Sequence, residues 1–141
     1  MKSIKLQFNA ESVNFFSGLY FMADHNSANR DYFSLHQILT LWSAGLYHIY
    51  IPISDNDEPM GMCHGRFTHG DFFGHCYFLK EHRGHEGLCG MHDCIKLMKK
   101  DLGAKRIMAN ILDFNRRAKI FVRSEGFIKD GNFYVLDLKE Y

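Results

Sequence analysis

Residues 79–103 read LKEHRGHEGLCGMHDCIKLMKKDLG, and this stretch decides the fold. Gly84, Gly87 and Gly90 interrupt the chain directly after a predicted strand. Behind them, apolar residues recur at spacings of three and four, which predicts a helix with one apolar face, formed by Leu88, Met91, Ile95, Met98 and Leu102. Lysines in its last turns suit the helix dipole, and Gly103 predicts its end.

The residues before this stretch predict one strand, two helices and then three more strands. Ile4, Leu6 and Phe8 alternate with polar residues, which is the period of a strand. A helix is predicted from Glu11 to Ala23, bounded by a turn at His25-Asn26-Ser27, and a second helix is predicted between Asp31 as its cap and Gly45 as its stop. Three strands then form an antiparallel meander, with bounds of 47–53, 60–67 and 72–80.

The residues after this stretch predict a strand, a short helix and a hairpin. The strand covers 106–112, Asn115 caps the helix, which stops at Gly126, and the hairpin joins 127–129 to 133–138. The resulting order, β-α-α-β-β-β-α-β-α-β-β, predicts a mixed α/β domain with about seven strands and helices on both faces of the sheet. No linker or repeat divides the chain, so residues 1–141 are predicted to form one domain.

Composition restricts the class of protein. The 141 residues are 46% apolar and 23% charged, which is ordinary for a folded domain, and the net charge of +1 provides no electrostatic footprint for nucleic acid or an anionic membrane. Residues 1–12 lack the apolar run of a signal peptide, and no stretch approaches the roughly 20 apolar residues that span a bilayer. We therefore expect a cytoplasmic protein whose four cysteines are reduced.

The order of elements and two local patterns resemble the GNAT superfamily of N-acetyltransferases. The first pattern is residues 79–88, similar to the family's strand and glycine loop, and the second is Asn115, Ala118, Phe121, Gly126 and Phe127 in the family's register. Together they cover about residues 72–138. The resemblance implies that acetyl-CoA binds here, with its pyrophosphate at a helix N-terminus. The cofactor-binding residues that it implies are Phe78, Leu79, Arg83, Gly84, His85, Glu86, Gly87, Leu88, Asn115 and Phe121.

The chain departs from the family pattern at three positions. Glu86 and Leu88 stand where the loop has small residues, and a carboxylate repels phosphate. A shifted loop that uses Gly87 and Gly90 is the alternative. Val122 stands where many family members carry a tyrosine that protonates the leaving thiolate, and valine has no proton to donate.

The resemblance also implies where catalytic groups lie. A backbone N–H of Phe78 or Leu79 would polarise the thioester, and a base near the same strand would deprotonate the amine. His75 is our first candidate for this base because histidine titrates near neutral pH, and Glu81 is the second. The structural alternative is that His75 is only a packed or surface residue.

A metal site is a weaker interpretation of the same helix. His85, Cys89 and His92 are four and three residues apart, so they could share one face of the predicted helix, but structural zinc usually needs four well-spaced ligands. We therefore predict no metal.

Two functions remain open at this point. The first is an acyl-CoA-dependent N-acetyltransferase that acts on an amine of a small molecule or a protein. The second is a catalytically inactive GNAT-fold protein that binds an assembly partner, because the short length and altered loop resemble small GNAT-like proteins of tailed phages; its location would be the host cytoplasm or the virion. A homodimer could pair through the last strands. A fold alone does not choose between the two functions.

Overall fold

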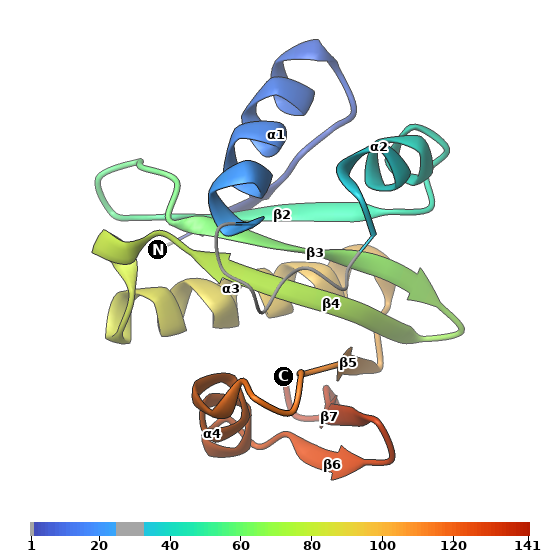
Figure 1. Ribbon diagram of the computed structural model, residues 1–141, viewed down its shortest axis with the longest axis vertical. Helices are drawn as coiled ribbons and strands as arrows, with labels where there is room; N and C mark the ends of the chain where they lie inside the picture. The colour runs from blue at the N-terminus through green and yellow to red at the C-terminus, as the bar shows by residue number, and fades with distance from the viewer. Residues whose placement is uncertain (1, 25–32) are drawn as a thin grey trace.

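The computed structural model describes residues 2–24 and 33–141, which form a seven-stranded sheet with helices on both faces (Figure 1). The strands lie in the order β1-β2-β3-β4-β5-β7-β6, and every neighbouring pair is antiparallel except β4 and β5. The elements are β1 (Lys2–Lys5), α1 (Ala10–Asp24), α2 (Leu35–Ser43), β2 (His48–Ile53), β3 (Gly61–Thr68), β4 (Asp71–Phe78), the 3₁₀ turn η2 (Lys80–His82), α3 (His85–Leu102), β5 (Arg106–Ala109), α4 (Arg116–Ser124), β6 (Ile128–Asp130) and β7 (Phe133–Asp137). The predicted fold class and element order are confirmed.

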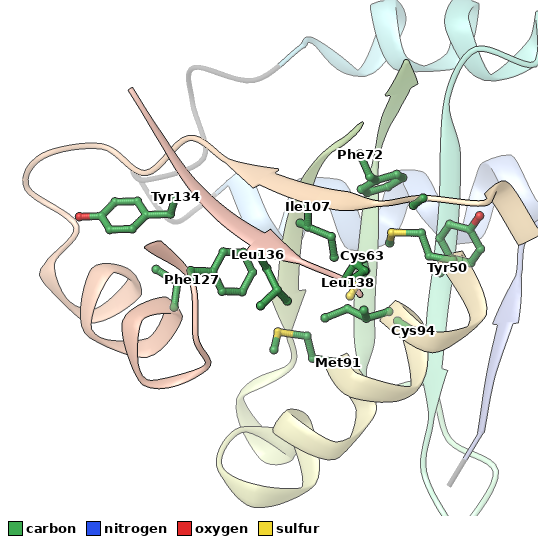
Figure 2. Close-up of a cluster of buried hydrophobic side chains, with 14 residues drawn as sticks. Tyr50, Cys63, Phe72, Met91, Cys94, Ile107, Phe127, Tyr134, Leu136 and Leu138 are labelled. Atoms are coloured by element: carbon green, nitrogen blue, oxygen red, sulfur yellow. The ribbon is translucent and has the colours of Figure 1, made fainter. Parts of the chain in front are cut away.

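The sheet separates two hydrophobic cores. Helices α1 and α2 cover one face, where Phe16, Ile38 and Trp42 pack against alternate residues of β2. Helix α3 covers the other face, and α4 lies beside the C-terminal strands. Figure 2 shows this second core, in which side chains from β3, β4, β5 and β7 meet Met91 and Cys94 of α3. Because both faces of the central strands are covered, β2 is buried along nearly its whole length.

Two strand boundaries differ from the sequence prediction. Strand β1 ends at Lys5 rather than Phe8, because Phe8 leaves the sheet and packs edge to face on Trp42 with ring centroids 5.2 Å apart. Strand β5 ends at Ala109 rather than at 112, and the residues after it line a cavity.

The helix caps were predicted with mixed success. The Asn115 side chain accepts a hydrogen bond from the Ala118 N–H at 3.2 Å, so the predicted cap of α4 is confirmed. The cap of α2 is Ser34, which forms a capping box with Gln37. Asp31, the predicted cap, and the predicted turn at 25–27 lie outside the described residues. None of the described helices is long and apolar enough to cross a membrane.

Candidate functional site

Strands β4 and β5 separate after a short parallel ladder. Only the first three residues of β4, Asp71–Phe73, pair with β5. At this closed end, the Arg106 guanidinium donates two hydrogen bonds, of 2.9 and 2.8 Å, to the carboxylate of Asp71. Beyond Phe73, none of the described strands pairs with the side of β4 that faces β5, which leaves an opening in the middle of the sheet.

A cavity of about 510 Å³ lies at this opening on the face covered by α3 and α4. Its walls come from the free half of β4, the first turns of α3, the segment after β5, and α4. Seven of the predicted cofactor-binding residues line it: Phe78, Arg83, Gly84, Gly87, Leu88, Asn115 and Phe121. Leu79, His85 and Glu86 are not among its lining residues.

The N-terminus of α3 opens into this cavity. The helix begins at His85, directly after Gly84, whose φ of +96° and ψ of −143° are accessible almost only to glycine. A Cβ atom added to Gly84 would find no atom within 4 Å, so the space in front of the helix is open. The first N–H groups of an α-helix have no intrahelical partner, and they attract anions.

The other two glycines of the predicted loop have a different role. Gly87 and Gly90 lie inside α3, not in a turn, which corrects the sequence interpretation. A Cβ on Gly87 would lie 2.7 Å from the carbonyl oxygen of His82, and a Cβ on Gly90 would lie 2.6 Å from Cε of Met60. These glycines let the helix pack closely on the sheet. The shifted loop, in which they would hold phosphate, is therefore wrong.

Glu86 does not close the cavity. Its carboxylate contacts Nδ1 of His82, one helical turn back, and Nε2 of that imidazole lies 3.8 Å from a carboxylate oxygen of Glu58. The charge of Glu86 therefore lies outside the cavity, near the start of α3. Leu88 does reach the cavity wall, where it packs against the core.

The backbone of β4 separates the two predicted oxyanion donors. The Leu79 N–H donates to the carbonyl of Met60, the residue before β3, at 2.9 Å, so this N–H is directed away from the opening. Because N–H groups alternate sides along a strand, the N–H of Phe78 points away from β3, toward the opening. The Phe78 carbonyl, on the same side, accepts a hydrogen bond of 3.0 Å from Nε of Arg83.

Helix α4 supplies the far wall of the cavity. Asn115 and Phe121 line it, as the resemblance implied, and Phe121 is 40% exposed. Val122 is buried and also lines the cavity, so no proton donor stands at the position of the family's tyrosine. Sequence reasoning missed Asn110 and Arg117 as lining residues. A polar residue directly after a strand could have indicated Asn110, whereas nothing distinguished Arg117 from the other cations of α4.

A second cavity, of about 460 Å³, lies on the opposite face of the sheet. Its lining residues are Phe33, Gln37, Tyr47, Arg66, Phe73, Gly74, His75, Met108, Asn110, Leu112 and Phe133. The two cavities share Gly74, His75, Asn110 and Leu112, which lie where β4 and β5 separate. We refer to them below as the α3-side cavity and the α2-side cavity. The four shared residues place them on the two sides of the gap in the sheet.

His75, the first candidate for the base, is one of the residues that line both cavities. Burial lowers its pKa well below the usual value, and the neighbouring His64 lowers it further; the two ring centroids are 5.6 Å apart. His64 is itself buried, which lowers its pKa to about 3, and its Nδ1 lies 2.6 Å from the Tyr47 hydroxyl. Glu81, the second candidate, lies on the exposed turn η2 and lines neither cavity.

The three candidate metal ligands on α3 take part in two separate contacts instead of one cluster. Nε2 of His85 lies 3.6 Å from Sγ of Cys89, whereas His92 bonds to a carboxylate oxygen of Glu125 at 2.7 Å. Across residues 2–24 and 33–141, no three histidine, cysteine or acidic side chains are placed to hold a metal ion.

Comparison with solved structures decides the architecture. The chain is similar to a GNAT-family acetyltransferase from Staphylococcus aureus, with a TM-score of 0.68 and 16% identity over 97% of this chain and 99% of the other. The chain has the GNAT fold. The same fold occurs in a ribosomal-protein-S5-alanine acetyltransferase from Vibrio fischeri, with a TM-score of 0.67 and 14% identity over 100% of this chain and 96% of the other.

A third GNAT-fold structure contains bound ligands. It is a spermidine N-acetyltransferase from Vibrio cholerae in complex with CoA and spermine, with a TM-score of 0.68 and 12% identity over 95% of this chain and 92% of the other. No family model matches the sequence, and no curated protein matches it either. At these identities the likeness establishes the GNAT fold, as the two local sequence patterns predicted.

Proposed function

We propose that this chain is an acyl-CoA-dependent N-acetyltransferase. The observation that carries the proposal is the pair of cavities on opposite faces of the sheet, which share four lining residues where β4 and β5 separate. Such an arrangement lets a thioester approach from one face and an amine from the other. The GNAT-fold neighbours support this class of reaction, since they are acetyltransferases of a ribosomal-protein alanine and of spermidine.

The α3-side cavity has the chemistry that acetyl-CoA requires. The open helix N-terminus at Gly84 offers unpaired N–H groups to a pyrophosphate, and two cationic residues, Arg83 and Arg117, are among the residues that line the same cavity. Phe78, Met91 and Phe121 supply apolar surface for the pantetheine chain. The residues present therefore fit this cofactor, and Glu86 is turned toward His82 instead of the cavity.

Bound acetyl-CoA supplies an activated thioester, whose C–S bond breaks as a C–N bond to the acceptor forms. The Phe78 N–H, directed into the opening, stabilises negative charge on the carbonyl oxygen. His75, at the junction of both cavities, accepts the proton that the amine loses, directly or through water. Its lowered pKa keeps the imidazole neutral, and thus able to accept, through the physiological pH range. Because Val122 has no proton to donate, the Cys76 thiol, which lines the cavity, or solvent would supply the proton that the leaving thiolate needs.

Two measurements test the proposal. A thermal-shift titration with acetyl-CoA at about 100 times its Kd should stabilise the fold by about 2.7 kcal/mol, a rise in Tm of roughly 5–10 °C. No response to millimolar acetyl-CoA or propionyl-CoA would refute acyl-CoA binding and favour the assembly-protein hypothesis. In a mass-spectrometric assay of amine acetylation, His75→Ala should lower kcat by a factor of about 100 or more. His36→Ala, on the exposed face of α2, is the matched control and should leave kcat unchanged.

A further inference from the structure

The α2-side cavity, where the proposed function places the acceptor amine, is lined by both apolar and polar groups. Four aromatic rings line it, those of Phe33, Tyr47, Phe73 and Phe133. Met108 and Leu112 add further apolar surface. Among the described lining residues, Gln37, Tyr47, His75 and Asn110 carry polar groups, and the one formal charge is that of Arg66. None of the described residues that line it is a carboxylate. The cavity thus favours an acceptor that carries an anionic group and an apolar group.

The guanidinium of Arg66 is oriented by aromatic rings. Arg66 lies on β3 directly opposite Phe73 on β4. Its Cζ lies 5.6 Å from the centroid of the Phe73 ring and 5.3 Å from that of Phe33, both within the range of a cation–π interaction. These contacts hold the guanidinium at the cavity wall, and its N–H groups are the donors that match a planar acceptor such as a carboxylate.

Arg66 forms no ion pair with any described carboxylate and donates no hydrogen bond to another described residue. This contrasts with Arg106 at the β4–β5 ladder, whose guanidinium donates two hydrogen bonds to the Asp71 carboxylate. Since none of the described side chains takes the donors of Arg66, we take them to be available to an anionic ligand.

The spacing along β4 limits the size of the acceptor. The side chains of Phe73 and His75 lie on the same face of the strand, two residues and so about 7 Å apart. A carboxylate bound above Phe73 and an amine bound beside His75 each need a hydrogen bond of about 3 Å. Because these hydrogen bonds need not run along the strand, both ligand groups can lie as close together as the carboxylate and amine that one carbon atom carries in an α-amino acid.

We infer that the acceptor is a free α-amino acid with an apolar or aromatic side chain, whose carboxylate is bound by Arg66. This inference rests on the proposed function, because it assigns the acceptor of the same reaction. A polyamine does not fit, since it would place further positive charge beside Arg66 with no described carboxylate in the cavity wall to balance it. The nearby aromatic rings accommodate the side chain of the amino acid.

A matched pair of amines tests the inference. L-phenylalanine and phenethylamine differ only in the carboxylate, and spermidine represents the polyamines. With acetyl-CoA, kcat/KM for phenylalanine should exceed that for phenethylamine by about tenfold or more, as expected for hydrogen bonds to a charged group. Arg66→Gln should remove this preference by lowering kcat/KM for phenylalanine alone, and Arg66→Lys should retain part of it. Because Arg66 is exposed, these variants are expected to fold.

A second readout needs no turnover. Phenylalanine alone should raise the Tm of the wild-type chain more than phenethylamine does, and Arg66→Gln should abolish the difference. Equal use of the two amines, equal shifts in Tm, or a preference for spermidine would overturn the inference. If acetyl-CoA still raises the Tm in that case, the proposed function stands and only the acceptor assignment falls. Absence of any acetyl-CoA response, with phenylalanine still selected through Arg66, would leave an amino-acid-binding cavity without the transferase.

Discussion

Gly84→Ala should separate the role of the α3 N-terminus in ligand binding from its role in stability. Gly84 adopts φ +96° and ψ −143°, a conformation that costs a non-glycine residue about 1–3 kcal/mol. No atom lies within 4 Å of the added methyl group, so steric contact adds nothing to this cost. At roughly 2–4 °C per kcal/mol, the Tm should fall by about 2–12 °C.

The same substitution should weaken acetyl-CoA binding beyond its effect on stability. Relief of the strain rotates the backbone that directs the first N–H groups of α3, and the methyl group enters the space in front of them. A tenfold rise in Kd would reduce ligand stabilisation by about 1.4 kcal/mol at saturation, so the acetyl-CoA shift in Tm should shrink by roughly 3–6 °C.

Gly103→Ala is the matched control for this experiment. Gly103 ends the same helix at φ +68°, again with no atom within 4 Å of an added Cβ. Its substitution should cost about 1–2 kcal/mol, yet leave the shift caused by acetyl-CoA unchanged, because this end of α3 does not line the cavity. A Gly84→Ala variant that keeps the full shift would refute the assignment of the α3 N-terminus as the phosphate site.

Three further predictions follow from particular contacts. Glu86→Gln removes a negative charge near the proposed phosphate site, so calorimetry at low salt should show an affinity for acetyl-CoA about two- to fivefold higher than that of the wild type. This gain should disappear at high salt, and the absence of a gain at low salt would contradict the charge argument. The pKa of His64 is lowered to about 3 in the folded state, so unfolding takes up a proton below about pH 6.5. The contribution of neutral His64 to the free energy of unfolding is complete above that pH and falls by about 2 kcal/mol at pH 5. Urea unfolding of His64→Asn should therefore show a smaller pH dependence than that of the wild type. Cys63 and Cys76 lie directly opposite each other on β3 and β4, with their Sγ atoms 2.9 Å apart, so hydrogen peroxide should join them in a disulfide. Intact-mass spectrometry should then show the loss of two hydrogen atoms. An unchanged mass, or the same loss in Cys76→Ser, would contradict this pairing.

Local patterns in the sequence were sufficient for the order of the elements. The spacing of Leu88, Met91 and Ile95 predicted α3 because an apolar stripe at helical period must face a core. Asn115 predicted the start of α4 because its cap depends only on residues within one turn. These features are decided by neighbours in sequence, so they can be predicted without knowledge of the fold.

The candidate site was predicted less completely because it depends on contacts between distant segments. Gly84, Gly87 and Gly90 cannot be distinguished from the sequence. In the fold, a Cβ added to Gly84 would meet open space, whereas one added to Gly87 or Gly90 would contact His82 or Met60. Arg66 carries no sequence signal, and only the pairing of β3 with β4 places it over Phe73.

By itself, the sequence determined the GNAT order of strands and helices, the Asn115 cap of α4, and the position of the glycine-initiated helix, because periodicity and turn chemistry act over a few residues. The tertiary structure alone decided that β4 and β5 separate after Phe73, that Glu86 turns toward His82, and that two cavities share His75 as a lining residue. The separation of two strands depends on how many residues of each find a partner across the sheet. That number is set by long-range packing, which no single stretch of the chain encodes.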